Sequence, residues 1–124
     1  MTAKIEATDD YADYDPSALP APVPAYLDAH DENRHADAVA AFAPGATVLD
    51  DGTTYDGIDA ISAWVRRSAT EYEYTSTRIG QRIVDGAHVV VRVRLDGSFP
   101  GGTVTLRYQF AHHAGLITRL AIEV

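Results

Sequence analysis

The sequence contains no cysteine. This absence excludes a disulfide framework, a thiolate metal site and a cysteine nucleophile. Packing therefore has to hold the fold together, as it does in most cytoplasmic proteins, and the cytoplasm is the expected location. Any chemistry has to rely on other side chains.

Positive charge is also scarce. Lysine and arginine together number 10 against 18 aspartates and glutamates, which gives a formal net charge of −8. A field of this sign repels nucleic acid and anionic membrane surfaces, so neither is expected as a partner. Many of the acidic residues lie in the first 15 positions, so the net charge of the rest of the chain is closer to zero.

Long apolar runs are missing as well. No stretch is long enough to span a bilayer, and the N-terminus lacks the basic start and apolar run of a signal peptide. The chain has no Gly-rich phosphate loop, no nucleophile elbow centred on serine and no dinucleotide fingerprint. We therefore expect no cofactor.

The length of 124 residues fits one domain with one core. Residues 1–20 are acidic, contain Pro16 and Pro20 and lack an apolar period, which predicts an extended or partly disordered arm. Residues 21–124 are expected to form the domain. Three side chains of the arm are suited to pin it to a neighbouring surface: Tyr11, Tyr14 and Leu19.

Three helices are predicted in the first half of the domain. The first has the period of a helix with one buried face, because positions i, i+3, i+4 and i+7 are occupied by Val23, Tyr26, Leu27 and His30. A second, short helix is expected to end at Pro44-Gly45. A third begins at Asp56 or Gly57, and its buried face carries Ile58, Ile61, Trp64 and Val65.

The remaining segments are predicted strands. A strand over 46–49 and a short return over 53–55 form a hairpin around Asp50-Asp51-Gly52. Four long strands follow as a meander, over residues 72–84, 87–95, 103–110 and 116–124. Apolar residues alternate with polar ones along the strands, so one face of the sheet is buried and the fold class is α+β.

The segment from Tyr26 to Trp64 resembles the nuclear-transport-factor-2-like superfamily, in particular its SnoaL-like and ketosteroid-isomerase-like branches. The strongest likeness lies in AAFAPGATVLDDGTTYDGIDAISAW. The resemblance implies a cone-shaped, cystatin-like fold in which three N-terminal helices pack on a strongly curved, mostly antiparallel mixed sheet and enclose a pocket. It also implies a homodimer that pairs through the sheet face carrying Arg92, Arg94 and Arg107.

The resemblance to ketosteroid isomerase suggests roles for single residues. Tyr26 matches the tyrosine on the family's first helix, and Asp50 matches its catalytic base, in an active site where a tyrosine and a protonated aspartate bind the substrate oxygen. The position that resembles this second aspartate holds Leu106. One of the two hydrogen bonds to a dienolate oxygen would therefore be absent.

Each candidate has a plainer interpretation. Asp50 either faces the pocket as a base or bonds backbone amides in a hairpin turn. Tyr26 either donates its hydroxyl to a substrate or is a core tyrosine. His30, on the same helix face, either transfers a proton or is a half-exposed residue near the helix end. Expected substrate-binding positions are Tyr55, Trp64, Val89, Val91, Leu106 and Tyr108.

The adjacent His112 and His113 fall in a predicted turn and are not expected to bind a metal. Neighbouring strand residues point to opposite faces, and no further ligands lie nearby in the sequence. Five arginines are expected on the convex or dimer-facing side of the sheet: Arg78, Arg82, Arg92, Arg94 and Arg107.

Two functions are compatible with these patterns. The first is a cofactor-free isomerase, cyclase or dehydratase that acts by proton transfer on a small apolar carbonyl compound, with Asp50, Tyr26 and His30 as catalytic residues. The second is a module of the same fold that binds an apolar ligand or dimerises without catalysis. Leu106 and the small number of polar groups predicted in the pocket favour the second.

Overall fold

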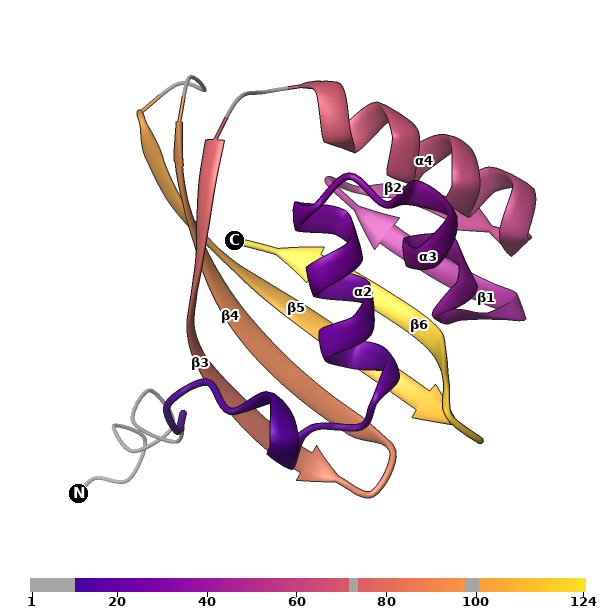
Figure 1. Ribbon diagram of the computed structural model, residues 1–124, viewed down its shortest axis with the longest axis horizontal. Coiled ribbons are helices and arrows are strands. Elements are labelled where there is room, and N and C mark those ends of the chain that lie inside the picture. The colour runs from indigo at the N-terminus through magenta and orange to yellow at the C-terminus, as the bar shows by residue number, and fades with distance from the viewer. Residues whose placement is uncertain (1–10, 72–73, 98–100) are drawn as a thin grey trace.

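A computed structural model describes residues 11–71, 74–97 and 101–124 of the chain (Figure 1). Its helices are the 3-10 turn η1 (Pro16–Ala18) and the α-helices α2 (Pro22–Asp31), α3 (His35–Ala40) and α4 (Gly57–Glu71). Its strands are β1 (Phe42–Asp50), β2 (Thr53–Asp56), β3 (Tyr74–Asp85), β4 (His88–Gly97), β5 (Thr103–His113) and β6 (Leu116–Glu123).

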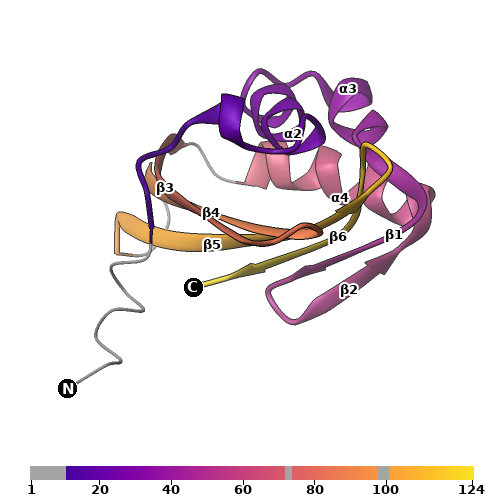
Figure 2. The same ribbon diagram turned by 90° about the horizontal axis from the view of Figure 1, so that it is seen from below.

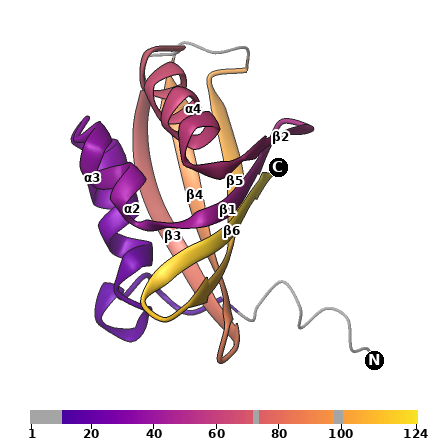
Figure 3. The same cartoon turned by 90° about the vertical axis from the view of Figure 1, so that its right-hand side faces the viewer.

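The strands form one open, mixed sheet in the order β2-β1-β6-β5-β4-β3. Strands β1 and β6 are parallel, and the other neighbouring pairs are antiparallel. The three α-helices lie on one face of the curved sheet (Figures 2 and 3). The predicted α+β class, the meander and the cystatin-like arrangement are confirmed.

The covered face of the sheet carries the apolar residues that the alternation predicted. Val89 pairs with Phe110, and Val91 pairs with Tyr108, so these side chains share the face under the helices. All four are buried. The core therefore lies between this face and the buried sides of α2 and α4, which contribute Val23, Tyr26, Leu27, Ile61, Trp64 and Val65.

Strand β1 begins earlier than expected. The second helix ends at Ala40, and Phe42 already pairs with Ile117 of β6, so Pro44-Gly45 lies inside the strand instead of ending the helix. The register with β6 shifts between Phe42 and Thr47. A proline is tolerated there because an irregular stretch of pairing does not require its missing N–H.

The hairpin between β1 and β2 turns at Asp51 and Gly52, whose φ angles are 52° and 78°. Two successive residues with positive φ are typical of the type I′ turn that fits the twist of a two-residue hairpin. This tight turn places Asp50 as the last residue of β1, directly opposite Thr53.

A bulge in β3 changes the predicted direction of one arginine. The pairing of β3 with β4 skips a residue between Arg78, opposite Val93, and Gly80, opposite Arg92. Arg78 therefore shares the helix-covered face with Val93, whereas Arg82 pairs with Val90 on the outer face. The placement of Arg78 on the convex side is thus wrong, because strict alternation does not survive a bulge.

The described part of the predicted arm, residues 11–20, lies against the domain. Ala12 exchanges two backbone hydrogen bonds with Gln81, which adds a bridge to the edge of β3. Tyr11 lies under the guanidinium groups of Arg82 and Arg92, and Leu19 is buried in the core. The prediction for residues 1–10 concerns a segment outside the described residues.

The two adjacent histidines end a strand and do not form a turn. His112 and His113 pair with Ile117 and Leu116 of β6, and the chain reverses at Ala114-Gly115, where φ is 53° and 81°. In the described ranges, no helix has both the length and the apolar character needed to cross a membrane.

Candidate functional site

A pocket of about 520 Å³ opens between α2, α4 and the sheet. It is lined by six residues that the sequence pointed to: Tyr26, His30, Asp50, Trp64, Leu106 and Tyr108. Leu49, Leu95 and Ile122 add apolar wall. The pocket therefore combines an apolar surface with a small number of polar side chains, which is the usual composition of a small-molecule site.

Asp50 is held by an indole. It is half-buried at the end of β1, and its Oδ2 accepts a 2.9 Å hydrogen bond from Nε1 of Trp64. Trp64 is 2% exposed and comes from the buried face of α4. The carboxylate is therefore turned toward α4 and the pocket, and it does not cap its own hairpin turn.

Tyr26 lies at the centre of the aromatic contacts. Its ring stacks on Trp64 with centroids 6.3 Å apart and lies 5.9 Å from the ring of His30. Burial raises the pKa of its hydroxyl well above the ordinary value, and interactions with Tyr108, Tyr74 and Asp50 raise it further. The phenol therefore stays protonated and is a hydrogen-bond donor.

Two further tyrosines line the same pocket. Tyr108 lies on the face of β5 that carries Leu106, and Tyr74 comes from the start of β3. Burial raises the pKa of both hydroxyls, and the charge of Asp50 contributes to each shift. Among the described residues, the Tyr26, Tyr74 and Tyr108 hydroxyls have no hydrogen-bond partner, so three neutral donors are available to a ligand.

His30 contacts polar groups through both ring nitrogens. Nε2 lies 3.4 Å from Oγ of Ser68 on α4, and Nδ1 lies 3.8 Å from Oδ1 of Asp31. The His30 side chain is 11% exposed and lines the pocket together with Ser68. The imidazole is therefore oriented from two sides, in contrast to the half-exposed helix-end histidine of the plainer interpretation.

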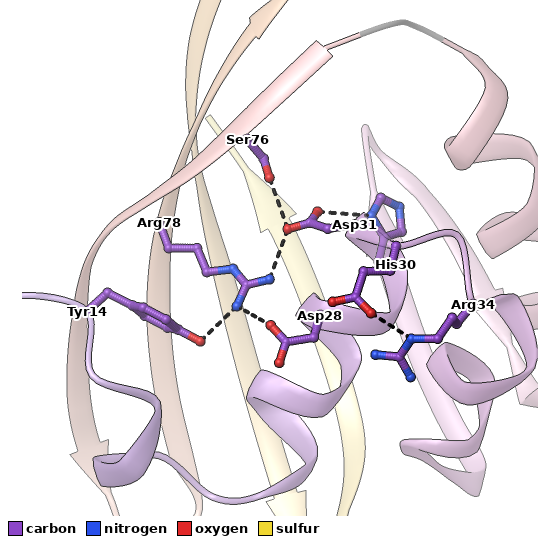
Figure 4. A network of polar contacts seen from close by, with 8 residues as sticks. Tyr14, Asp28, His30, Asp31, Arg34, Ser76 and Arg78 are labelled. Carbon is purple, nitrogen blue, oxygen red and sulfur yellow. Dashed lines mark hydrogen bonds and ion pairs between the residues drawn. The ribbon is translucent and has the colours of Figure 1, made fainter.

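Arg78 joins the arm, α2 and β3 beside His30 (Figure 4). It donates to Asp28 at 2.6 Å, to Asp31 at 2.9 Å and to the Tyr14 hydroxyl at 3.0 Å. Burial acts to raise the pKa of Asp31, but hydrogen bonds from His30, Arg78 and Ser76 outweigh it and hold this pKa below its ordinary value. Asp31 is therefore ionised beside His30.

Three of the expected binding residues lie outside this pocket lining. Val89 and Val91 are buried in the core, because their stretch of β4 lies under the helices instead of at the pocket. Tyr55 packs against Trp64 with ring centroids 6.2 Å apart, and its hydroxyl accepts a hydrogen bond from Arg67. Tyr55 therefore packs against Trp64, which lines the pocket, but is not itself part of the lining.

Sequence reasoning missed Ser68 and Tyr74 as pocket residues. Ser68 follows Trp64 by four positions, so the helical period assigns both to one face. Tyr74 precedes Ser76 and Arg78 at steps of two on β3, which assigns these three side chains to one face ahead of the bulge. The sequence therefore contained both spacings. Which face of β3 lies toward the helices, however, is decided by the pairing of β3 with β4.

Within residues 11–71, 74–97 and 101–124, no group of three or more histidine, aspartate or glutamate side chains is arranged to hold a metal ion.

Comparison with known proteins identifies similar domains. The model of the SnoaL-like domain family matches residues 23–119. A solved structure of a Sinorhizobium meliloti protein, named as a polyketide cyclase, is 34% identical and has a TM-score of 0.82, with 89% of this chain and 100% of that chain covered. The comparison with curated proteins found no match.

More distant structures share the fold. A Catenulispora acidiphila protein with a ketosteroid-isomerase-like fold, solved with trimethylamine, is 22% identical at a TM-score of 0.73, covering 86% of both chains. A Mycobacterium tuberculosis protein, solved with estradiol-17β-hemisuccinate, is 16% identical at a TM-score of 0.69, covering 83% of this chain and 90% of that one.

Proposed function

Since the chain belongs to the SnoaL-like domain family, we propose that its pocket catalyses cofactor-free proton transfer on a small, mostly apolar carbonyl compound. One observation carries the proposal. The Asp50 carboxylate, oriented by Trp64, lines the same pocket as the unpartnered, neutral hydroxyl of Tyr26.

Asp50 is the base in this reaction. It removes a proton from the carbon next to the carbonyl group, and the electron pair left behind forms an enolate. The hydrogen bond from Trp64 leaves the second carboxylate oxygen, Oδ1, to accept the proton. A fixed carboxylate also avoids the entropy cost of orienting a mobile one during the reaction.

Tyr26 stabilises the enolate oxygen. A neutral donor in a site of low dielectric is worth more than the same donor in water, because no solvent competes with it. Leu106 cannot supply the second donor, but Tyr108 lies two residues further along the same strand face, and Tyr74 of β3 lines the same pocket. Either hydroxyl replaces the missing hydrogen bond.

The walls of the pocket favour an apolar substrate of modest size. Leu49, Leu95, Leu106 and Ile122 offer no charge to a ligand. The names of the similar proteins support the same class, because one is named as a polyketide cyclase and another was solved with a steroid ester. A hydrophobic carbonyl compound therefore fits both the lining and these comparisons.

Deuterium exchange tests the proposal. We expect the protein to catalyse exchange of the α-protons of 4-phenylbutan-2-one in D₂O, followed by NMR, and Asp50→Asn to lower the rate by about 10²–10⁴-fold. Asp59→Asn is the matched control, because Asp59 is an exposed carboxylate in the first turn of α4. Equal rates for Asp50→Asn and the wild type would refute the base role.

Leu106 supports a second candidate, a binding protein without turnover. An apolar residue at that position leaves the pocket with fewer fixed charges, which suits the storage or transport of an apolar ligand. The same assay separates the two functions. Binding of 4-phenylbutan-2-one, detected through Trp64 fluorescence, without any exchange above the solvent rate would favour this candidate.

A further inference from the structure

His30 is a second titratable group in the pocket, and the reaction proposed above does not use it. Proton removal next to a carbonyl needs a base and a donor for the enolate oxygen, which Asp50 and Tyr26 provide. Isomerisation returns the proton to another carbon through the same base. The polar contacts of His30 therefore require a different explanation.

Helix α4 relates the two groups. Trp64 holds Asp50 at 2.9 Å, and Ser68, four residues later on the same helix, lies 3.4 Å from Nε2 of His30. Tyr26 is in ring contact with both Trp64 and His30. The pocket thus presents a carboxylate from β1 together with a neutral phenol and an imidazole from α2, and contacts with Trp64 and Ser68 of α4 connect these groups.

We infer that His30 is the general acid for a second oxygen of the substrate, so that the pocket takes a β-hydroxycarbonyl compound and eliminates water from it. This inference rests on the proposed proton-transfer function and names its substrate class. Elimination needs three groups, namely a base at the α-carbon, a donor at the carbonyl oxygen and an acid at the leaving hydroxyl.

The bonds balance without any cofactor. Asp50 takes the α-proton, and the C–H electron pair forms the enolate, whose oxygen accepts a hydrogen bond from Tyr26. The enolate electrons then form the double bond between the α- and β-carbons as the β-carbon–oxygen bond breaks. The departing oxygen takes a proton from His30 and leaves as water, and solvent returns the proton from Asp50 to His30.

Asp31 is a positioning residue in this reaction. Its Oδ1 lies near Nδ1 of His30, while its Oδ2 is fixed by Arg78 at 2.9 Å and by Ser76 at 3.1 Å. Nδ1 lies beside the Asp31 carboxylate, so Nε2 is the nitrogen next to Ser68, which lines the pocket together with His30. The carboxylate sets the ring orientation, as an aspartate does beneath a general-base histidine in hydrolytic triads.

Two probes separate this inference from the proposed function. The ketone 4-phenylbutan-2-one has acidic α-protons but no hydroxyl group, whereas 4-hydroxy-4-phenylbutan-2-one also has a hydroxyl on its β-carbon. We expect elimination of water from the hydroxyketone to give the conjugated enone, detected by its ultraviolet absorbance and by NMR. His30→Gln should lower this rate by about 10²–10⁴-fold, a much larger factor than the one by which it lowers exchange of the ketone α-protons, because exchange has no leaving hydroxyl to protonate.

A second His–Asp pair offers the matched control. Nδ1 of His88 lies 2.8 Å from Oδ1 of Asp85 in the hairpin of β3 and β4, and neither residue lines the pocket. His88→Gln should leave both rates unchanged. Asp31→Asn should lower elimination more than exchange, whereas damage to the fold would lower both together.

The outcomes are distinct. If the ketone does not exchange, the proposed function fails. If the ketone exchanges through Asp50 but the hydroxyketone is not converted, or His30→Gln eliminates water at the wild-type rate, only the inference about His30 is overturned. Cleavage of the hydroxyketone to benzaldehyde and acetone would also overturn it, because the carbon–carbon bond would then break in place of the carbon–oxygen bond.

Discussion

Trp64 and Ser68 lie four residues apart on one face of α4, and each contacts a different titratable side chain of the pocket. Trp64 donates to Asp50, and Ser68 lies next to His30. Because residues four apart on a helix are neighbours, one rigid element fixes both contacts at once. A movement of α4 would therefore disturb the Asp50 carboxylate and the His30 imidazole together.

Trp64→Phe tests the hydrogen bond to Asp50. The phenylalanine ring preserves the stacking on Tyr26 but removes the N–H donor, and a hydrogen bond to a charged group contributes about 1.5–3 kcal/mol. We expect Asp50-dependent exchange of 4-phenylbutan-2-one to fall by about tenfold or more. Tyr55→Phe changes another ring that packs against Trp64 and is the control, and an equal effect of the two variants would contradict the positioning role.

The pocket tyrosines should resist alkaline ionisation. The pKa values of Tyr26, Tyr74 and Tyr108 are raised, so the unfolded chain loses these protons at a lower pH than the folded protein does. Their contribution to stability is full below about pH 10 and is lost as the pH rises through the folded values. Phenolate absorbance measured against pH, with each Tyr→Phe variant compared with Tyr14→Phe, checks this; a normal titration of Tyr26 would contradict it.

Arg78→Met should destabilise the protein at neutral pH. Arg78 joins Asp28, Asp31 and Tyr14, and because the acidic partners are partly exposed we expect a loss of about 1–3 kcal/mol. The control Arg94→Met breaks an exposed ion pair with Asp96 and should cost less than about 1 kcal/mol. Urea unfolding measures both; equal losses would refute the central role of Arg78.

The same variant should alter acid stability. The lowered pKa of Asp31 contributes stability that is present above the unfolded value of 3.8 and lost as the pH falls through the folded value. Arg78→Met removes one cause of the shift, so its stability should depend less on pH between about 5 and 2. An unchanged acid-unfolding profile would contradict this assignment.

Gly52→Ala should cost about 1 kcal/mol of unfolding free energy, because an alanine at a φ of 78° is strained. Gly45→Ala is the matched control. A Cβ at either glycine meets no atom within 4 Å, and only Gly52 has a positive φ. The difference between the two variants in thermal unfolding therefore reports backbone strain, and equal melting temperatures would contradict it.

The outer face of the sheet is proposed as a dimer interface. Arg92 lies directly opposite Arg107 on this face, and Arg107 forms a 3.1 Å ion pair with Glu123. We expect light scattering at micromolar concentration to give twice the chain mass of 13.4 kDa. Arg107→Glu should shift the protein toward the monomer by placing two acidic groups side by side, and a 13.4 kDa species in the wild type would reject the dimer.

The sequence by itself determined the elements and the fold class. The 3.6-residue period of α2 and α4, the two-residue alternation in β4 and β5, and the glycine-containing turns are local signals. Such local patterns predict an element correctly where one of its faces is buried, because the burial of that face produces the pattern. The likeness of residues 26–64 to a known superfamily also pointed to Asp50 and Tyr26 before any contact was known.

Only the tertiary structure decided how the site is assembled. The indole of Trp64 reaches Asp50 because α4 packs on β1, and Arg78 and Tyr74 face the helices because a bulge follows Arg78 in the pairing of β3 with β4. Pairing register and bulges depend on strands that are distant in sequence, and a shift of one residue turns every side chain to the other face. For this reason Tyr74 and the contacts that join Arg78, Asp31 and His30 could be assigned to the site only from the tertiary structure.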